Sequence, residues 1–332
     1  METRKLQKVG GSTYSVSLPK EWATDHHLEA GMSIHLYPHA DGSLIVRSDR
    51  QDGGPLASTR LRLSRVDADT IRRTLYAAYA VGYDVVTLVA PDTEAFDGDD
   101  YRLIRRLTES TLGLSVVEEG SDRVTVESLL DASELSIQQS VTQLRFTALS
   151  MHRTAVDAFP DGDAVDLDRR DDGADRLLGA VTRHLNRSLV DFGEVDRLDV
   201  PRTSLFDHYL TARELERVAD HAVRIGSLAG RVDDTPPADV LDEITGLADA
   251  SRAVVKTATA ALLDGSCDEA HEVLNRRDRV FDDLDTLDTV LMERSPPAGY
   301  VLSRVVSTLA RTAECGGTIA TAALRSSARP DR

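Results

Sequence analysis

Three pairs of carboxylates in the second half of the sequence are spaced four residues apart. They are Asp171 with Asp175, Glu216 with Asp220, and Asp278 with Asp282. On a helix this spacing places both carboxyl groups on one side, about 5–6 Å apart at Cβ, where they repel each other unless a cation lies between them. The pairs are therefore candidate metal ligands, and an all-carboxylate set favours hard ions such as Mg, Mn or Ca.

A solvated surface is the competing interpretation, because any one acidic pair in a chain this rich in aspartate is more often surface than ligand. On a helical wheel, Glu216 lies beside Ala219, and Asp171 lies near an apolar seam over residues 174–185. These two pairs are at the edge of apolar faces, where packed helices could bring them together. The third pair falls opposite the apolar seam of its own helix and fits a solvated face equally well.

The charge of the chain is unevenly distributed. The 39 basic and 56 acidic residues give a net charge of −17, yet residues 1–50 hold six of each, so the whole acidic excess lies in residues 51–332. Of the four lysines, Lys5, Lys8 and Lys20 lie in the first twenty residues. The Asp-rich and Lys-poor remainder resembles the composition of halophilic archaeal proteins, whose hydrated carboxylate surface keeps them soluble in molar salt.

The length and the cysteines limit the class of protein. A chain of 332 residues is expected to form two or three domains with a buried core. Cys267 and Cys315 lack partners at zinc-site or redox-motif spacing, which argues against a disulfide scaffold. No apolar stretch approaches 18 residues and the N-terminus lacks the pattern of a signal peptide. We therefore expect a cytoplasmic protein with no stable membrane insertion.

The first fifty residues have the pattern of short strands. Apolar and polar residues alternate over residues 13–18, a short helix is expected over Lys20–Leu28, and a hairpin is expected around Asp41-Gly42. Four short strands and one helix bury little surface. We therefore expect residues 1–50 to form a homodimer.

The middle of the chain, residues 59–130, has the order β-α-β-α-β-β of a small α/β domain, with one helix stopped by Gly82 and another expected over Asp99–Leu112. It contains no Gly-rich phosphate loop, and its role stays open.

From Asp131 onward six helical stretches are expected. Residues 193–201 are one of the expected breaks between them. Three of them echo the other three, which predicts tandem three-helix bundles over residues 131–230 and 236–326.

Two helical segments carry a family resemblance. ELERVADHAVRIGSLA (214–229) resembles the signature helix of PhoU-type phosphate-uptake regulators, and RRDDGADRLL (169–178) resembles the acidic second helix of the same repeat. The resemblance covers about residues 130–326. It implies tandem three-helix bundles that carry metal clusters, often iron or zinc, and that couple phosphate status to transport and signalling.

By position, the resemblance implies a first metal site and a second one. The first would use Asp171, Asp175, Glu216 and Asp220, and the second Asp278, Asp282 and Glu314. The second repeat departs from the pattern, because Ala310 replaces the glutamate and Cys315 replaces the histidine that His221 provides in the first. The identity of the metal (Fe, Zn, Mn or Mg) is open, and iron or zinc would be favoured if His221 or His208 contributes.

The N-terminal segment KLQKVGGSTYSVSLPKEWATDHHLEAGMSIHLY (5–37) resembles the SpoVT-AbrB type of DNA-binding domain. The resemblance implies a swapped-hairpin dimer that places basic side chains from both subunits on DNA. Residues 1–20 carry a local charge of +3, which doubles in a dimer, whereas the rest of the chain would repel phosphate. The expected DNA contacts are Arg4, Lys5, Lys8, Ser12, Tyr14 and Lys20. Solvated lysines that protect a strand edge are the alternative.

The overall fold class is therefore mixed: a β-rich swapped-hairpin domain, a small α/β domain and all-α PhoU-like bundles. These features predict a non-enzymatic transcriptional regulator of phosphate uptake that binds promoter DNA, with a phosphate ABC-transporter component as a further partner. The alternative is a PhoU-like adaptor of phosphate transport and signalling that uses the N-terminal domain only to dimerise. A metal-dependent hydrolase is a third possibility, although the sequence places no general base or nucleophile for it.

Overall fold

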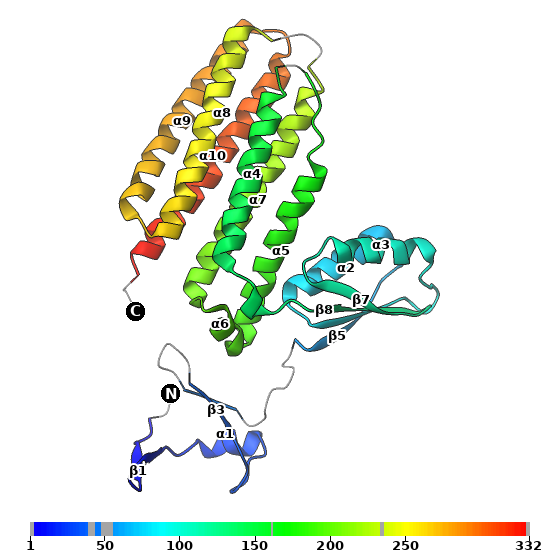
Figure 1. The fold of residues 1–332 in the computed structure, drawn as a ribbon, viewed down its shortest axis with the longest axis vertical. Coiled ribbons are helices and arrows are strands. Elements are labelled where there is room, and N and C mark those ends of the chain that lie inside the picture. Colours follow the sequence, from blue (N-terminus) through cyan, green and yellow to red (C-terminus); the bar gives the residue numbers. More distant parts are fainter. Residues whose placement is uncertain (1–2, 39–43, 48–55, 161, 233–235, 330–332) are drawn as a thin grey trace. The chain divides into compact units, whose positions relative to one another are not determined.

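The chain forms two compact units, residues 1–54 and 55–332, which we call the head and the body. The computed structural model describes residues 3–38, 44–47, 56–160, 162–232 and 236–329 (Figure 1). Each unit is considered separately below.

The head consists of two small hairpins and one short helix. Strands β1 (Gln7–Val9) and β2 (Thr13–Ser15) pair antiparallel, as do β3 (His35–Pro38) and β4 (Leu44–Arg47). Helix α1 (Lys20–Asp25) lies between the hairpins in the chain and is shorter than expected, because His27 has a φ of 53° in the left-handed region. The expectation of a β-rich N-terminal part with small sheets is confirmed. The predicted turn at Asp41-Gly42 lies outside the described residues.

The described part of the head lacks a buried core. Within residues 3–38 and 44–47, no residue whose burial is described is buried, and apolar side chains on the strands and loops are exposed to solvent. The exposed large ones are Leu6, Val9, Tyr14, Val16, Met32, Ile34, Leu36 and Leu44. A unit of this size that buries so little apolar surface lacks the main driving force for folding alone.

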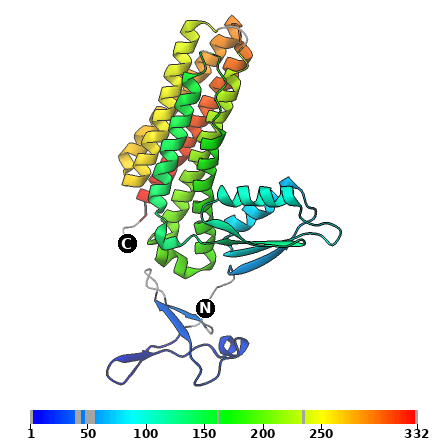
Figure 2. The ribbon, with the colours of Figure 1, turned by 45° about the vertical axis from the view of Figure 1, so that its right-hand side comes forward.

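The body begins with a four-stranded sheet of order β5-β6-β8-β7. Strands β5 (Ser58–Arg62) and β6 (Val85–Val89) are parallel, while β8 (Arg123–Ser128) pairs antiparallel with both β6 and β7 (Leu114–Glu119). Helices α2 (Ala68–Val81) and α3 (Gly98–Glu109) cover one face of the sheet (Figure 2). The predicted order β-α-β-α-β-β is confirmed.

Local signals in the sequence set the ends of these helices. Asp67 caps α2 by accepting hydrogen bonds from two backbone N–H groups, and Gly82 ends the helix with a φ of 108°. Helix α3 ends at Glu109 rather than at Leu112 as predicted. The hydroxyls of Ser110 and Thr111 both donate to the carbonyl of Leu107 and so replace the next turn of the helix.

Six long helices build the rest of the body. They are α4 (Ile137–Asp157), α5 (Asp168–Val190), α7 (Arg202–Ala229), α8 (Ala238–Asp264), α9 (Cys267–Arg294) and α10 (Gly299–Ser327). A short 3-10 helix, η1 (Ala132–Glu134), precedes α4. Among the described residues no helix is long and apolar enough to cross a membrane.

One prediction about this region was wrong. Residues 193–201 were expected to be a break between helices, but most of them form a seventh helix, α6 (Phe192–Leu198). The side chain of Asp191 caps it by accepting a hydrogen bond from the N–H of Gly193 at 3.0 Å. The glycine therefore begins a short helix instead of separating two long ones, and Asp199 ends it in the left-handed region.

The helices form two groups of three that share one apolar core. Helices α4, α5 and α7 pack together, as do α8, α9 and α10, and the groups meet where α7 lies against α10 and α4 against α8 (Figure 1). The buried side chains of both groups form a single cluster. Gly316 allows α10 to approach α8 closely, since a Cβ there would lie 2.7 Å from Cγ1 of Val254.

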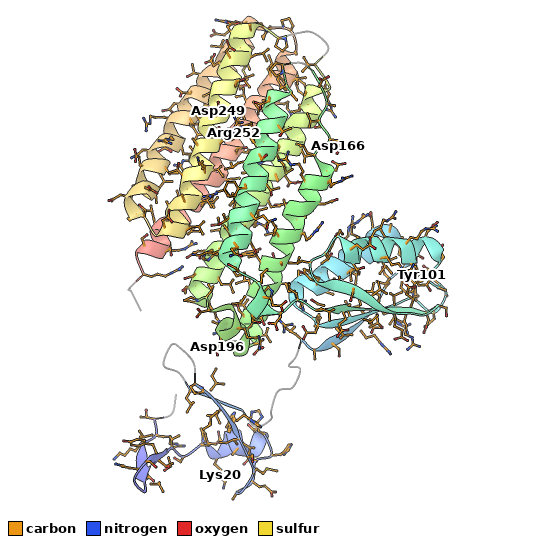
Figure 3. The ribbon with its side chains drawn as sticks, viewed as in Figure 1. Lys20, Tyr101, Asp166, Asp196, Asp249 and Arg252 are labelled. Atoms are coloured by element: carbon orange, nitrogen blue, oxygen red, sulfur yellow. The ribbon has the colours of Figure 1, made fainter. Side chains whose placement is uncertain are left out.

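A chain of polar side chains crosses the contact between the two groups. His152 on α4 bonds Arg252 on α8 at 3.2 Å, and Thr312 on α10 lies within 3.4 Å of His152 and 3.1 Å of His221 on α7. Arg252 also pairs with Asp249 one turn away on α8, where Figure 3 labels both residues. Burial is the main cause that lowers the pKa of His152 to about 3 and that of His221 to about 4, so both histidines are neutral at pH 7.

Candidate functional site

The first candidate site is a basic hairpin in the head. Lys8 on β1 lies directly opposite Tyr14 on β2, so the two side chains share one face of the hairpin. Gln7 and Val9 point to the other face by alternation. Both Lys8 and Tyr14 are exposed, and a lysine beside a tyrosine hydroxyl provides two donors for phosphate oxygens.

The other predicted DNA contacts flank this hairpin. Arg4 and Lys5 precede β1, Ser12 lies in the β1–β2 turn, and Lys20 is the first residue of α1, where Figure 3 labels it. Gly10 makes the turn with a φ of 66°. The structure therefore places five of the six predicted residues on or next to one hairpin, and Lys20 at the start of the helix that follows.

The second candidate site is an acidic face on the body. Helices α5 and α7 pack side by side and bring Asp171 and Asp175 close to Glu216 and Asp220. Asp171 and Glu216 are half-buried, and one carboxylate oxygen of Asp171, Oδ1, is buried without a hydrogen-bond partner. Sequence spacing predicted each pair, and the packing of α5 on α7 brings the pairs together.

Burial and mutual repulsion raise the pKa values in this acidic face. Burial raises the pKa of Glu216 to about 7, with a further rise from the charges of Asp220, Asp175 and Asp171. For Asp171 the same two causes raise the pKa to about 6. The pKa values of Asp175 and Asp220 are raised as well, mainly by burial. A bound cation would relieve this repulsion.

The side chains of the acidic face are of the type that binds a hard metal ion, but their positions in this structure do not form a coordination site. Four carboxylates are the oxygen donors that Mg or Mn prefers, and the unpartnered Oδ1 of Asp171 is available. No group of three or more His, Cys, Asp or Glu side chains among the described residues is placed to hold a metal ion. Metal binding here would require the carboxylates to move closer together.

Each of the two histidines considered as a further ligand has one ring nitrogen bonded. Nδ1 of His221 bonds the Thr312 hydroxyl inside the contact between the helical groups. Nδ1 of His208 bonds the carbonyl of Ser204 at 2.7 Å, and its Nε2 has no hydrogen-bond partner. The donors that the structure brings together on the acidic face itself are the four carboxylates.

The residues of the predicted second metal site are exposed on two helices, α9 and α10. Asp278 and Asp282 are exposed on α9, and Asp278 pairs with Arg277 at 2.6 Å. Glu314 is exposed on α10, while its neighbour Cys315 is buried. An arginine already neutralises part of this set, in contrast to the first.

The structure also contains a buried cluster that sequence reasoning missed. Arg183 on α5 is fully buried and donates to the carbonyls of Tyr79 and Tyr83 at 3.2 and 2.8 Å, and it pairs with Asp84 at 3.0 Å. Arg187, one turn later, donates to the carbonyl of Gly82 at 2.7 Å. These cations bind the C-terminal end of α2, where unpaired carbonyls favour positive charge.

The cluster continues through Glu194 on α6. Both Arg187 and Arg197 pair with Glu194, and His184 bonds it within the interior. These partners lower the pKa of Glu194 to about 2, although its burial acts in the opposite direction. The cluster joins the α/β part of the body to its helices. The only sequence signal for it is the four-residue spacing of Arg183 and Arg187.

Comparison with known proteins bears on the helical part of the body. Residues 141–229 match the PhoU domain. This match spans α4, α5, α6 and α7, and it contains all four carboxylates of the acidic face. Asp278, Asp282 and Glu314 lie outside the PhoU-domain match.

Comparison with solved structures also found a similarity. The crystal structure of the phosphate transport system regulatory protein PhoU from Streptococcus pneumoniae aligns with 58% of this chain and 93% of its own, at 15% sequence identity and a TM-score of 0.45. No curated protein sequence matches the chain.

Proposed function

We propose that this protein regulates phosphate uptake, with the body responding to phosphate status and the head binding promoter DNA. The observation that carries the regulatory part is the PhoU-domain match over residues 141–229. The protein would act by binding and not by catalysis, and a phosphate ABC-transporter component would be a further partner. Incubation with a phosphomonoester and Mn or Fe should release no phosphate.

DNA binding by the head is supported by charge and by the form of the hairpin. Lys5, Lys8 and Lys20 are exposed, and Lys8 shares a face with the Tyr14 hydroxyl. The net acidic charge of the chain falls on the body, which would repel a phosphate backbone. Contact with DNA would therefore be confined to the head, as its resemblance to the SpoVT-AbrB type implies.

A dimer through the head would supply what the head lacks. Its exposed apolar side chains could be buried against the same side chains of a second copy, and two basic hairpins would double the positive charge offered to DNA. Swapping of the hairpins between the two copies is one way to achieve this burial.

Charge reversal in the head tests the DNA-binding proposal. The double variant Lys5→Glu/Lys8→Glu should lose at least about a hundredfold in affinity for phosphate-uptake promoters, because four contacts in a dimer change from attraction to repulsion. Lys256→Glu on α8 is the matched control, since this lysine is exposed on the body. Fluorescence anisotropy at two salt concentrations would measure both. Equal affinity of the double variant and the control would contradict DNA binding by this hairpin.

An adaptor of phosphate transport and signalling is the second candidate function. It is favoured by the exposed apolar side chains of the head. These would be buried in a dimer whether or not the head binds DNA. In this case Lys5→Glu/Lys8→Glu would leave the phosphate-uptake phenotype unchanged, whereas substitutions on the acidic face would alter it.

We propose that the acidic face of the body binds a metal ion. Asp171, Asp175, Glu216 and Asp220 would hold a Mg or Mn ion, or iron or zinc if a histidine were to turn towards them. The ion would neutralise the repulsion that raises the pKa values of these groups. Equilibrium dialysis of Asp171→Asn/Glu216→Gln should show loss of a bound ion, and Asp278→Asn/Asp282→Asn should lose at most a weaker one.

A further inference from the structure

The body contains a cavity at the seam between its α/β part and its helices. The cavity has a volume of about 300 Å³, at the lower end of the range typical for small-molecule sites. Its walls come from α2, from the residues that follow α3, and from α5. Apart from Asp175, which belongs to the acidic face, the regulatory role proposed above uses no residue of this cavity. A ligand here would give the α/β part a role of its own.

One wall of the cavity is aromatic and held in place. Tyr79 is buried, and its hydroxyl donates to the carbonyl of Leu112 at 2.9 Å. Arg183 lies over the ring at 5.2 Å from its centre. Gly179 on α5 also lines the cavity and lies close to this ring, since a Cβ at that position would be in van der Waals contact with Cε1 of Tyr79, at 3.6 Å. Tyr76 lines the same wall one turn earlier and is half-exposed.

The other wall carries unpaired charge. Asp172 and Asp175 line the cavity from α5, and neither receives a hydrogen bond or an ion pair from the residues that the structure describes. Asp175 also belongs to the acidic face, so its field adds to that of Asp220. Arg176 is the only basic residue in the lining, and it forms no ion pair with any described residue.

We propose that this cavity binds a small organic cation, an amine carried on an aromatic or apolar body. The negative ring face of Tyr76 and the two carboxylates attract a positive charge, while Tyr79, whose ring already carries Arg183, adds apolar surface that suits a ring or an alkyl chain. An anion such as a nucleotide would instead meet the combined repulsion of Asp172, Asp175 and the acidic face. The proposal does not depend on the response to phosphate.

Calorimetric titration of the full-length protein tests the charge preference. The probes are phenethylamine, its neutral analogue phenethyl alcohol and its anionic analogue phenylacetate. Phenethylamine should bind at least about tenfold more tightly than either analogue. Asp172→Asn removes a negative charge that attracts the amine and should weaken its binding by roughly fivefold. Arg176→Gln removes a positive charge that repels the amine and should strengthen its binding.

A pair of glycines on α5 tests the location. Gly179→Leu fills the space beside Tyr79 and should reduce amine affinity more than tenfold. Gly173→Leu is the matched control on the same helix, where an added Cβ meets no atom within 4 Å, and it should bind like the unaltered protein. Circular dichroism and thermal unfolding confirm that both variants fold. The proposal is overturned if millimolar phenethylamine gives no binding heat, if phenylacetate or Mg-ATP binds as tightly, or if Gly179→Leu binds as well as Gly173→Leu.

Discussion

The head and the body of this chain obtain their stability in opposite ways. In the body, one apolar core runs through two groups of helices, and charged side chains that enter it, such as Arg183, have partners. In the described part of the head no residue of described burial is buried, and apolar side chains such as Val9 and Leu36 face solvent. The difference shows that the body carries its own apolar core, and it supports the proposal that the head gains stability from a second copy.

Loss of the arginine that joins the two parts of the body should have the largest effect. Arg183→Met removes the donor to the carbonyls of Tyr79 in α2 and Tyr83 just beyond it, and leaves Asp84 with one partner fewer. We expect a loss of about 2–4 kcal/mol in the free energy of unfolding, because two carbonyls at this joint lose their donor. Urea denaturation measures it, with Arg153→Met on the exposed face of α4 as the control. A loss below about 1 kcal/mol would show that the joint is dispensable.

The close approach of α8 and α10 should give the next largest effect. Gly316→Ala places a methyl group 2.7 Å from Cγ1 of Val254 and 2.9 Å from the backbone N of Val255, which should cost about 1–3 kcal/mol. Gly246→Ala on α8 meets no atom within 4 Å and should stabilise by about 0.5–1 kcal/mol. Thermal unfolding of both variants would test the packing of the body. If both change stability in the same direction, the close approach is not as described.

The acidic face should make stability depend on pH. The pKa of Glu216 is raised on folding to about 7, so its favourable contribution is present below about pH 4.5 and is lost as the pH rises through 7. Glu216→Gln should therefore be nearly neutral at pH 5 and stabilise by about 1–2 kcal/mol at pH 8. Glu272→Gln on an exposed face of α9 is the control. An equal effect of Glu216→Gln at both pH values would contradict the raised pKa.

The buried histidines act in the opposite direction. Because folding lowers the pKa of His152 to about 3 and that of His221 to about 4, stability should be lost as the pH falls below the ordinary histidine value near 6.5. Substituting His221→Gln should reduce this loss between pH 6.5 and 4. The measurement is the slope of unfolding free energy against pH, compared with that of the unaltered chain.

Substitutions in the head should have the smallest effect on the stability of the body. Val9→Ser/Leu36→Ser removes exposed apolar groups, so the unfolding of the body should change by less than about 0.5 kcal/mol. Association of two copies should nevertheless weaken, which analytical ultracentrifugation would detect. Leu144→Ala in the core of α4 should do the reverse, with lower stability and unchanged association. If the head variant associates like the unaltered chain, the dimer does not form through the head.

Local sequence patterns predicted correctly those features that depend on residues close together in the chain. Gly82 ends α2 as predicted, the β-α-β-α-β-β order of elements along the α/β part is confirmed, and the four-residue spacing of Asp171 and Asp175 places them on one face. Helix α6 was missed because Gly193 was interpreted as a break, although Asp191 caps the helix at that point.

Features that depend on distant parts of the chain could not be predicted in this way. The partners of Arg183 and Arg187 are some hundred residues earlier, and a periodic pattern does not indicate which carbonyls a buried arginine will bind. The same holds for the contact of His152 with Thr312 and for the cavity beside Tyr79. Whether Asp278, Asp282 and Glu314 bind a metal stays a prediction, as do the DNA contacts of the head.

The most direct test of the account is promoter occupancy in cells. Chromatin immunoprecipitation of the unaltered chain, of Lys5→Glu/Lys8→Glu and of Lys256→Glu would be compared in phosphate-rich and phosphate-starved cultures. We predict that the unaltered chain and Lys256→Glu occupy phosphate-uptake promoters to an extent that changes with phosphate supply, and that the double variant occupies none. Normal phosphate control of uptake in the double variant, with no occupancy by any form, would contradict the account.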